Sequence, residues 1–333
     1  MSLGRVRVTT SGRIHFGFVN LSLAHDRLYG GIGLSVCEPT TSVIAEPIDN
    51  SCNPPTVRCS HPSAREYAAR ALNTLDLDSV SVSVESALPQ HAGLGSGTQL
   101  ALATLTAVAN AYDQPPQPRE NAPALGRGGR SGVGVGTFEI GGFVIDGGHP
   151  TARFTTDRPT DGSWTVPPVM THKQIPDNWR FLLLTPDVEP GRSGTEEEAS
   201  MRSVVTQAAP DIADRVSGTV MRQLLPAIAN ENAEQFGTAI ETIGRLNGRW
   251  YTDEQGGVYR PPAGELVASL DASSSCYGAG QSSWGPTVYG ITDIEHADAA
   301  RRAGQHALDA ADVDGTVRIV QGQNHGVTVE QLE

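Results

Sequence analysis

Long apolar stretches are absent from this sequence, and aromatic residues are scarce. No segment of the 333 residues approaches the roughly 20 apolar residues in a row that a membrane-spanning helix requires. The amino terminus carries no charged-then-apolar leader, so we expect a cytoplasmic protein with no membrane partner. Aromatic residues make up 5% of the chain, beside 37 glycines and 22 prolines. This composition favours aliphatic cores joined by many tight turns.

Lysine is almost missing as well. Lys173 is the only lysine, and the formal net charge is −13. A chain this acidic repels phosphate backbones, which argues against sequence-independent binding of nucleic acid. Any phosphate site must therefore be local and built from backbone amides or a few arginines. The excess of acid is typical of a halophilic archaeon with a salt-rich cytosol, although an ordinary acidic enzyme remains the alternative.

The four cysteines follow no metal-ligand spacing. Cys52, Cys59 and His61 lie near one another, but they are too widely spaced for a zinc knuckle. We interpret the cysteines as structural or incidental thiols of an intracellular protein. At this length the chain is expected to form two lobes.

Strand and helix patterns alternate in both halves without the long βα repeat of a Rossmann sheet. We predict a two-lobed α+β fold, with a first domain at residues 1–165, a second at 166–333, and a connection within 150–178. Strands are expected at 5–9, 42–46, 80–85, 138–146, 181–184, 287–292, 316–320 and 327–329. Helices are expected at 63–75, 99–111 and 296–310, over most of 196–247, and within 258–280 before a glycine turn.

The clearest chemical signal is the glycine-rich run Gly93-Leu94-Gly95-Ser96-Gly97-Thr98-Gln99 between a predicted strand and an apolar helix. Glycines let successive backbone N–H groups converge, and the free amides at a helix start carry partial positive charge. We therefore predict a phosphate cradle over Gly93–Gln99 that needs no lysine. The hydroxyls of Ser96 and Thr98 are suited to a phosphate oxygen or to Mg²⁺. A plain strand–turn–helix joint is the competing interpretation.

This run resembles the phosphate-binding loop of the GHMP kinase superfamily, whose usual pattern is Pro-x-x-x-Gly-Leu-Gly-Ser-Ser. Gly97 stands where the kinases have the second serine, which they use at the magnesium ion. The run is similar to one branch in particular, the β-ribofuranosylaminobenzene 5′-phosphate synthase family. Residues 11–20, followed by Gly-Gly-Ile-Gly, resemble the amino-terminal signature of that branch, and residues 128–148 resemble its central signature. Residues 280–290 occupy the place of the third superfamily motif.

The resemblance implies a ribosomal-protein-like amino-terminal lobe, a ferredoxin-like carboxy-terminal lobe and a cleft between them. It implies transfer of a ribosyl phosphate from phosphoribosyl diphosphate to 4-hydroxybenzoate or 4-aminobenzoate, with loss of diphosphate and CO₂, in methanopterin-type cofactor biosynthesis. Mg²⁺ is the expected cofactor, and a homodimer is possible. An ATP-dependent kinase of a small alcohol and a non-catalytic sensor are the alternatives.

We assign roles to individual residues on this basis. The leaving diphosphate needs stabilisation, to which Arg130 contributes, and a cation such as Arg13 or His15 is expected to hold the benzoate carboxylate. Asp146 or Glu139 is expected to hold Mg²⁺ or to steady the developing cation. The candidate catalytic residues are His15, Arg130, Asp146 and Glu139. The candidate substrate-binding residues are Arg13, Asn20, Ser131, Ser282 and Ser283, and the candidate metal ligands are Ser96, Thr98 and Asp146.

Most of these residues also have a structural interpretation. His15 can be a hydrogen-bonded core histidine, Glu139 and Asp146 can be turn or cap carboxylates, and Arg130 can belong to a surface loop. Ser282 and Ser283 can serve only to pack the third motif against the cradle. The segment 191–194 before an acidic run is either a helix start or a phosphate-contacting loop.

Overall fold

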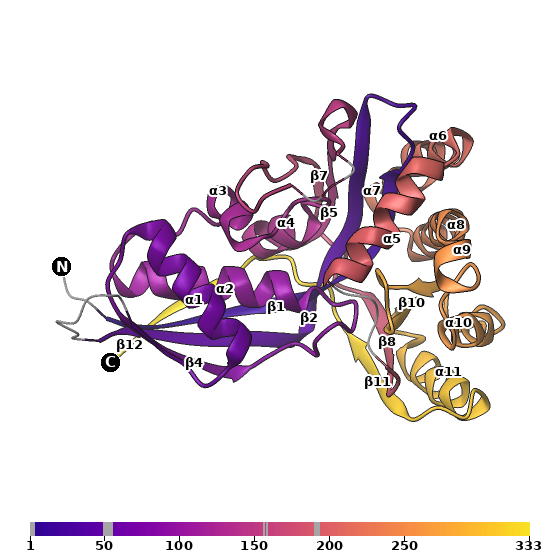
Figure 1. Ribbon diagram of the computed structural model, residues 1–333. Helices are drawn as coiled ribbons and strands as arrows, with labels where there is room; N and C mark the ends of the chain where they lie inside the picture. Colours follow the sequence, from indigo (N-terminus) through magenta and orange to yellow (C-terminus); the bar gives the residue numbers. More distant parts are fainter. Residues whose placement is uncertain (1–3, 49–55, 156, 158, 190–193) are drawn as a thin grey trace.

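The chain forms two lobes, each built on its own sheet (Figure 1). The computed structural model describes residues 4–48, 56–155, 157, 159–189 and 194–333. Both ends of the described chain lie at the far end of the first lobe (Figure 1). The predicted two-lobed α+β fold is confirmed.

The first lobe is organised by one long hairpin. Strands β1 and β2 are antiparallel neighbours, and the order continues as β12-β1-β2-β4-β3. The amino-terminal part of β2 also pairs with β5 and β6, and β5 pairs with β7. The strands of this sheet are β1 (Arg5–Asn20), β2 (Arg27–Pro47), β3 (Val57–Arg58), β4 (Val80–Ser86), β5 (Phe143–Asp146), β6 (His149–Pro150), β7 (Val169–Lys173) and β12 (Thr328–Leu332).

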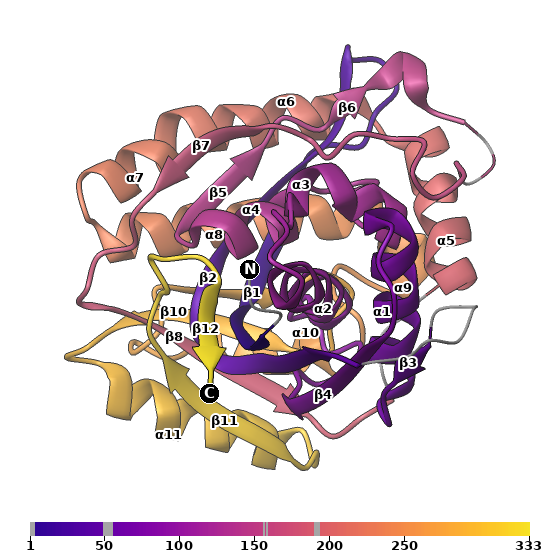
Figure 2. The same cartoon turned by 90° about the vertical axis from the view of Figure 1, so that its left-hand side faces the viewer.

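Helix α2 is the central helix of the first lobe, and it packs on β1 and β2 between α1 and α4. Figure 2 looks nearly along α2 and shows α1 and α4 beside it. Almost every α2 side chain is buried, because strands cover one side of the helix and helices cover the others. The helices here are α1 (Pro62–Leu75), α2 (Ser96–Ala111), α3 (Pro118–Asn121) and α4 (Val133–Ile140), with short 3₁₀ turns at Ala122–Leu125 and Thr151–Arg153.

The second lobe is an antiparallel sheet in the order β11-β8-β10-β9, contacted by α8, α10 and α11. Its strands are β8 (Trp179–Pro186), β9 (Gly278–Gln281), β10 (Val288–Asp293) and β11 (Gly315–Val320). Its helices are α5 (Gly194–Gln207), α6 (Pro210–Thr219), a π-helical turn (Val220–Leu224), α7 (Leu225–Ala229), α8 (Ala233–Trp250), α9 (Thr252–Gln255), α10 (Ala263–Asp271) and α11 (Ala297–Ala310).

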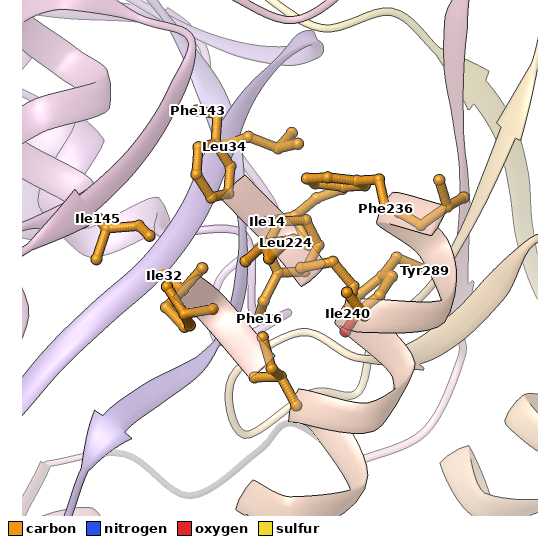
Figure 3. Packing of buried hydrophobic residues seen from close by; sticks show 14 of the residues in the cluster. Ile14, Phe16, Ile32, Leu34, Phe143, Ile145, Leu224, Phe236, Ile240 and Tyr289 are labelled. Atoms are coloured by element: carbon orange, nitrogen blue, oxygen red, sulfur yellow. The ribbon is translucent and has the colours of Figure 1, made fainter. Parts of the chain in front are cut away.

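A single hydrophobic cluster joins the two lobes. Phe16 of β1 meets Tyr289 of β10 edge to face, with ring centroids 5.0 Å apart. Phe143 of β5 meets Phe236 of α8 in the same manner at 5.8 Å. Figure 3 shows these rings converging with Ile14 between the lobes. Burial of this much apolar surface holds the lobes in one fixed arrangement.

Two expectations from the sequence need correction. The segment 138–146 was predicted as one strand, but α4 runs to Ile140 and β5 begins only at Phe143. Gly141 and Gly142, both with positive φ, separate the two elements. The lobes also do not divide cleanly between residues 165 and 166, because β7 and β12 both pair into the first sheet.

Two further findings concern the helices and the cysteines of the described residues. None of the helices in this part of the chain combines the length and the apolar character needed to cross a bilayer. Cys37, Cys59 and Cys276 form no disulfide, and Cys52 lies outside the described residues.

Candidate active site

Strand β1 is irregular where it reaches the junction of the lobes. Its pairing with β2 shifts register once between Ser11 and Arg13 and again between His15 and Gly17. Burial alternates along β1 as far as Ile14, and then His15 and Phe16 are both buried. Bulges re-aim side chains, and they are frequent beside active sites. Here they deliver Arg13 and His15 to one cavity.

The glycine-rich run predicted as a phosphate cradle forms a turn into α2, and the helix begins at Ser96 rather than at Gln99. Gly93 and Gly95 have φ values of 88° and 82°, which allow the tight turn into the helix. The carbonyl oxygen of Gly95 accepts from the amides of Thr98 and Gln99, both at 3.0 Å. The amides of Ser96 and Gly97 belong to the open first turn, where no intrahelical acceptor exists. The amides of Thr98 and Gln99 are therefore already engaged, and fewer amides of the run are available to a ligand than predicted.

Two members of the predicted cradle turn away from the cavity. Leu94 is buried in the core. Gln99 is fully buried, where its amide oxygen accepts from Thr10 at 2.7 Å and its amide nitrogen donates to the Gly134 carbonyl at 2.9 Å. These contacts tie α2 to β1 and α4. Gln99 therefore fixes the helix on which the cradle stands.

A loop of the second lobe is hydrogen-bonded onto the cradle. The Ser282 hydroxyl donates to the Gly93 carbonyl at 2.7 Å and accepts from the His15 amide at 3.1 Å. The Ser283 amide donates to the His15 carbonyl at 3.1 Å. Ser282 is fully buried, which agrees with the packing interpretation, whereas Ser283 is exposed and lines the cavity.

The cavity at this junction measures about 740 Å³ and is strongly basic. Its charged lining comprises Arg13, Arg127, Arg130, Arg153, Arg202 and Glu198, with His15, His91 and His149 beside them. Glu198 of α5 lies 3.8 Å from Arg130 and 3.5 Å from Arg202. Among the described residues that line the cavity, five arginines stand against one glutamate, in a chain of net charge −13, and this arrangement favours a multiply charged anion.

His15 is the first member of a hydrogen-bonded chain that leads out of the cavity. Its Nε2 lies 3.3 Å from the Ser131 hydroxyl, which donates to Asp146 Oδ2 at 3.0 Å. Burial, together with the positive charges of Arg13 and Arg130, holds the pKa of His15 well below its ordinary value. His15 is therefore a neutral group at the cavity wall.

Asp146 does not line this cavity, contrary to the predicted catalytic and metal-binding roles. It is 2% exposed, and its carboxylate accepts from the amides of Gly132 and Gly148 at 2.7 and 2.9 Å, besides Ser131. Burial raises the pKa of Asp146, although these donors oppose the shift. Asp146 thus orients the Ser131 hydroxyl from outside the cavity.

Glu139 and Asn20 also lie outside the cavity. Glu139 accepts from Arg119 Nη2 at 2.5 Å and forms a structural ion pair at the end of α4. The Asn20 amide group donates to the carbonyls of Ser22 and Arg27 and shapes the β1–β2 turn. We therefore remove Glu139 from the candidate catalytic residues and Asn20 from the candidate substrate contacts. Both corrections have one cause: the sequence shows residue type but not the neighbour that engages it.

The donor set for a divalent cation is sparse. Glu198 is the one carboxylate among the described residues that line the cavity, and Ser96 and Thr98 contribute hydroxyls. Mg²⁺ commonly combines one or two carboxylates with substrate phosphate oxygens. These residues fit an ion that arrives with a phosphate ligand, and Asp146 is not among them.

A smaller side pocket of about 50 Å³ adjoins the main cavity. His15, Phe18, Ser283 and Trp284 line both spaces. The Trp284 ring lies 4.9 Å from that of Tyr251, edge to face. The wall between the two spaces is therefore aromatic.

Sequence reasoning missed several cavity residues. Arg127 belongs to the same glycine-rich segment as Arg130, and this position in the sequence could have identified it as a candidate. Arg153, Arg202 and Glu198 carry no local motif, and only the folded chain brings them to the cavity. Arg192 and Ser193, the centre of the other predicted loop, lie outside the described residues.

Comparison with solved structures shows the fold. The homoserine kinase of Cytophaga hutchinsonii matches 98% of this chain and 97% of its own, with a TM-score of 0.69 and 18% identity. The mevalonate pyrophosphate decarboxylase of Streptococcus pyogenes matches 96% of this chain and 97% of its own, with a TM-score of 0.67 and 10% identity.

Comparison by sequence is more specific. A model of the GHMP kinases N terminal domain matches residues 63–141. The beta-ribofuranosylphenol 5′-phosphate synthase of Archaeoglobus fulgidus is 29% identical over 332 residues, 98% of this chain and 99% of the relative. That of Methanothermobacter thermautotrophicus is 31% identical over 330 residues, 96% of this chain and 97% of the relative. The chain thus belongs to the beta-ribofuranosylphenol 5′-phosphate synthase family, pentosyltransferase-type enzymes on the GHMP kinase fold.

Proposed function

We propose that this protein transfers the ribosyl 5-phosphate of phosphoribosyl diphosphate to 4-hydroxybenzoate, with release of diphosphate and CO₂, as a step toward a methanopterin-type cofactor. The observation that carries the proposal is the arginine-lined cavity at the head of α2 in a strongly acidic chain. The name of the relatives denotes a ribosylphenol phosphate product, which favours a para hydroxyl on the acceptor over a para amine.

The donor presents two anionic groups, a diphosphate at C1 and a phosphate at C5. The diphosphate is assigned to the cradle, because Ser96 and Gly97 line the cavity and their amides belong to the first turn of α2. Arg130, in the same cavity, supplies a charge-assisted contact to the leaving group. The remaining arginines leave enough positive charge for the 5-phosphate. Charge that develops on the diphosphate as the bond breaks therefore meets donors already in place.

The bond changes balance without an outside acid or oxidant. The C1–O bond to diphosphate breaks, and the electron pair leaves with the diphosphate. The ring carbon that bears the carboxylate forms the new C–C bond to C1. Loss of CO₂ then returns its bonding pair to the ring and restores aromaticity. The protein's main task is to place the two substrates and to stabilise the leaving group.

The acceptor is assigned to the side of the cavity where Phe18 and Trp284 stand beside His15. Of the two groups expected to hold its carboxylate, only Arg13 carries a charge, because the lowered pKa of His15 keeps the imidazole neutral. Arg13 is fixed by a hydrogen bond from Nη1 to the Gly93 carbonyl at 2.5 Å. Aromatic walls suit a benzoate ring, and a fixed guanidinium suits its carboxylate.

Magnesium enters this proposal as an ion carried by the donor's diphosphate. Bound there, it would neutralise part of the charge that leaves with the diphosphate. Ser96, Thr98 and Glu198 line the same cavity, and we expect them to complete its coordination.

The test is direct. The protein is incubated with phosphoribosyl diphosphate and either 4-hydroxybenzoate or 4-aminobenzoate, and diphosphate and CO₂ are measured together. We expect equal amounts of both products, with faster turnover of the hydroxyl acceptor. Turnover only with ATP and a small alcohol would establish the kinase alternative, and ligand binding without turnover would establish the sensor.

A pair of variants ties the activity to the cavity. Arg130→Gln is expected to lower kcat by at least about tenfold, since a charge-assisted hydrogen bond to the leaving group is lost. Arg301→Gln changes an exposed arginine of α11 in the second lobe and should leave the rate unchanged. Equal effects of the two substitutions would remove the cavity from the proposal.

A further inference from the structure

Gly97 occupies a position where glycine is not required by the backbone. It lies in the first turn of α2, and its φ is not positive, unlike those of Gly93 and Gly95. Any L-residue can adopt this conformation, and glycine is unfavourable within a helix. The absence of a side chain at Gly97 therefore needs another explanation.

The space beside Gly97 is filled by Arg127. A Cβ atom at position 97 would lie 3.0 Å from both terminal nitrogens of the Arg127 guanidinium and 3.2 Å from its central carbon. Such contacts are tighter than ordinary van der Waals contact, so the guanidinium would have to shift by a few tenths of an ångström to admit a Cβ. Gly97 is thus the residue that lets a guanidinium lie against the head of α2.

Arg127 is held where it is from several sides. Its Nη2 donates to the hydroxyl of Tyr67 on α1, and its central carbon stands 5.2 Å from the centre of the Tyr67 ring. Its amide donates to the Ala122 carbonyl at 2.9 Å, and its carbonyl accepts from the Trp164 indole at 2.8 Å. Arg127 also lines the main cavity, and its guanidinium lies against Gly97. It is therefore a fixed positive charge at the cradle.

We propose that Arg127 binds the diphosphate of the donor at the head of α2, and that Gly97 is the residue that admits its guanidinium. The inference rests on the proposed function. The guanidinium lies against Gly97 at the start of the helix, where a Cβ atom would crowd it. A guanidinium attracts diphosphate oxygens and can bind two of them at once. The Gly97–Arg127 pair thus adds a charged side-chain contact to the backbone amides of the cradle.

The experiment measures how the two residues depend on each other. Affinities for inorganic diphosphate and for phosphoribosyl diphosphate are determined by calorimetry for wild type, Gly97→Ala, Gly97→Ser, Arg127→Gln and Gly97→Ala/Arg127→Gln. Each single substitution is expected to weaken binding about tenfold or more, since a charge-assisted contact is displaced or removed. The double variant should bind no more weakly than Arg127→Gln alone, because Gly97 acts only through Arg127.

A control variant and a second measurement distinguish the proposed coupling from a general loss of folding. Arg153 lines the same cavity from another segment, so the effects of Gly97→Ala and Arg153→Gln should multiply. In thermal unfolding, Gly97→Ala should lower Tm in wild type and raise it in the Arg127→Gln background, where only the helix preference of alanine remains. This reversal of sign is measurable even if Gly97→Ala is poorly folded.

Multiplicative effects of Gly97→Ala and Arg127→Gln, or unchanged affinity in either single variant, would overturn the inference. Failure of the proposed function looks different. Wild type would then give no products from phosphoribosyl diphosphate and benzoate, while the dependence of Gly97 on Arg127 in binding of inorganic diphosphate would remain.

Discussion

At the scale of single residues, His15 is defined by the groups around it. The Ser131 hydroxyl accepts a hydrogen bond from the Val133 amide at 3.2 Å and donates a hydrogen bond to Asp146. Its oxygen can therefore act only as an acceptor toward His15, which assigns the imidazole proton to Nε2. The chain Asp146–Ser131–His15 sets the tautomer at the cavity wall without placing a carboxylate there.

The lowered pKa of His15 predicts a component of the pH dependence of stability. An unfolded histidine takes up a proton below about pH 6.5, whereas folded His15 stays neutral to lower pH. The unfolded state then binds more protons, so that acidification lowers the free energy of unfolding, by at most about 1.4 kcal/mol per pH unit. Below pH 6.5 we expect the free energy of unfolding, measured by urea titration, to fall less steeply with decreasing pH in His15→Gln than in wild type. Parallel curves would contradict the neutral assignment.

Asp146 makes a second prediction at this scale. In Asp146→Asn the new NH₂ group replaces one acceptor oxygen and faces N–H or O–H donors, so at least one buried donor loses its partner. We expect a loss of about 2–4 kcal/mol in the free energy of unfolding. We also expect reduced turnover, because Ser131 and His15 lose their orientation.

The positioning role of Asp146 separates from a metal role in one measurement. If Asp146 acts only by positioning Ser131, the magnesium concentration for half-maximal rate should not change in Asp146→Asn. A large rise in that concentration would restore the metal assignment.

At the scale of elements, Asn247 of helix α8 is hydrogen-bonded to the backbone near the carboxyl end of β1. Asn247 accepts from the Phe18 amide at 2.7 Å and donates to the Phe18 carbonyl at 3.0 Å, as a neighbouring strand would. A Cβ at Gly17, whose φ is 140°, would approach this side chain to 2.6 Å. The close approach of a first-lobe strand and a second-lobe helix thus depends on a glycine and an asparagine together.

Asn247→Ala removes both hydrogen bonds to Phe18 and leaves backbone groups unpaired between the lobes. We expect a loss of about 2–3 kcal/mol in the free energy of unfolding by urea titration. Gln235→Ala on the exposed face of the same helix is the control and should change stability by less than about 0.5 kcal/mol. Similar losses in both variants would show that Asn247 contributes only helix preference.

At the scale of the whole molecule, charge is divided between an acidic exterior and a basic cavity. The chain carries a net charge of −13, yet five arginines and one glutamate are the charged groups among the described residues that line the main cavity. Self-repulsion of the acidic exterior destabilises the compact state, and dissolved salt screens it. The same screening weakens attraction between the cavity and an anionic donor.

Stability and donor binding should therefore respond oppositely to salt. Between about 0.1 and 1 M KCl the Debye length falls from about 10 to 3 Å. Over this range we expect Tm to rise, while the affinity for phosphoribosyl diphosphate declines. Calorimetry and thermal unfolding on the same samples measure both, and a flat or falling Tm would remove the argument for adaptation to salt.

Local sequence was sufficient to predict the glycine-rich turn before α2 and the class of fold. A run such as Gly93-Leu-Gly95-Ser96 determines its own turn, because positive φ and the start of α2 follow from neighbours along the chain. The alternation of strand and helix patterns predicted the two lobes for the same reason. The errors at α4 and β5 arose where apolar residues allow helix and strand equally.

Membership of the site was decided by tertiary structure. Asp146 and Glu139 look alike in sequence, but one is enclosed by amides and a serine and the other is paired with Arg119. Arg153 and Arg202 reach the cavity from segments with no motif, and Arg127 reaches the cradle because Gly97 leaves room for it. Backbone turns depend on adjacent residues, whereas charge, burial and partners depend on which distant segments fold together.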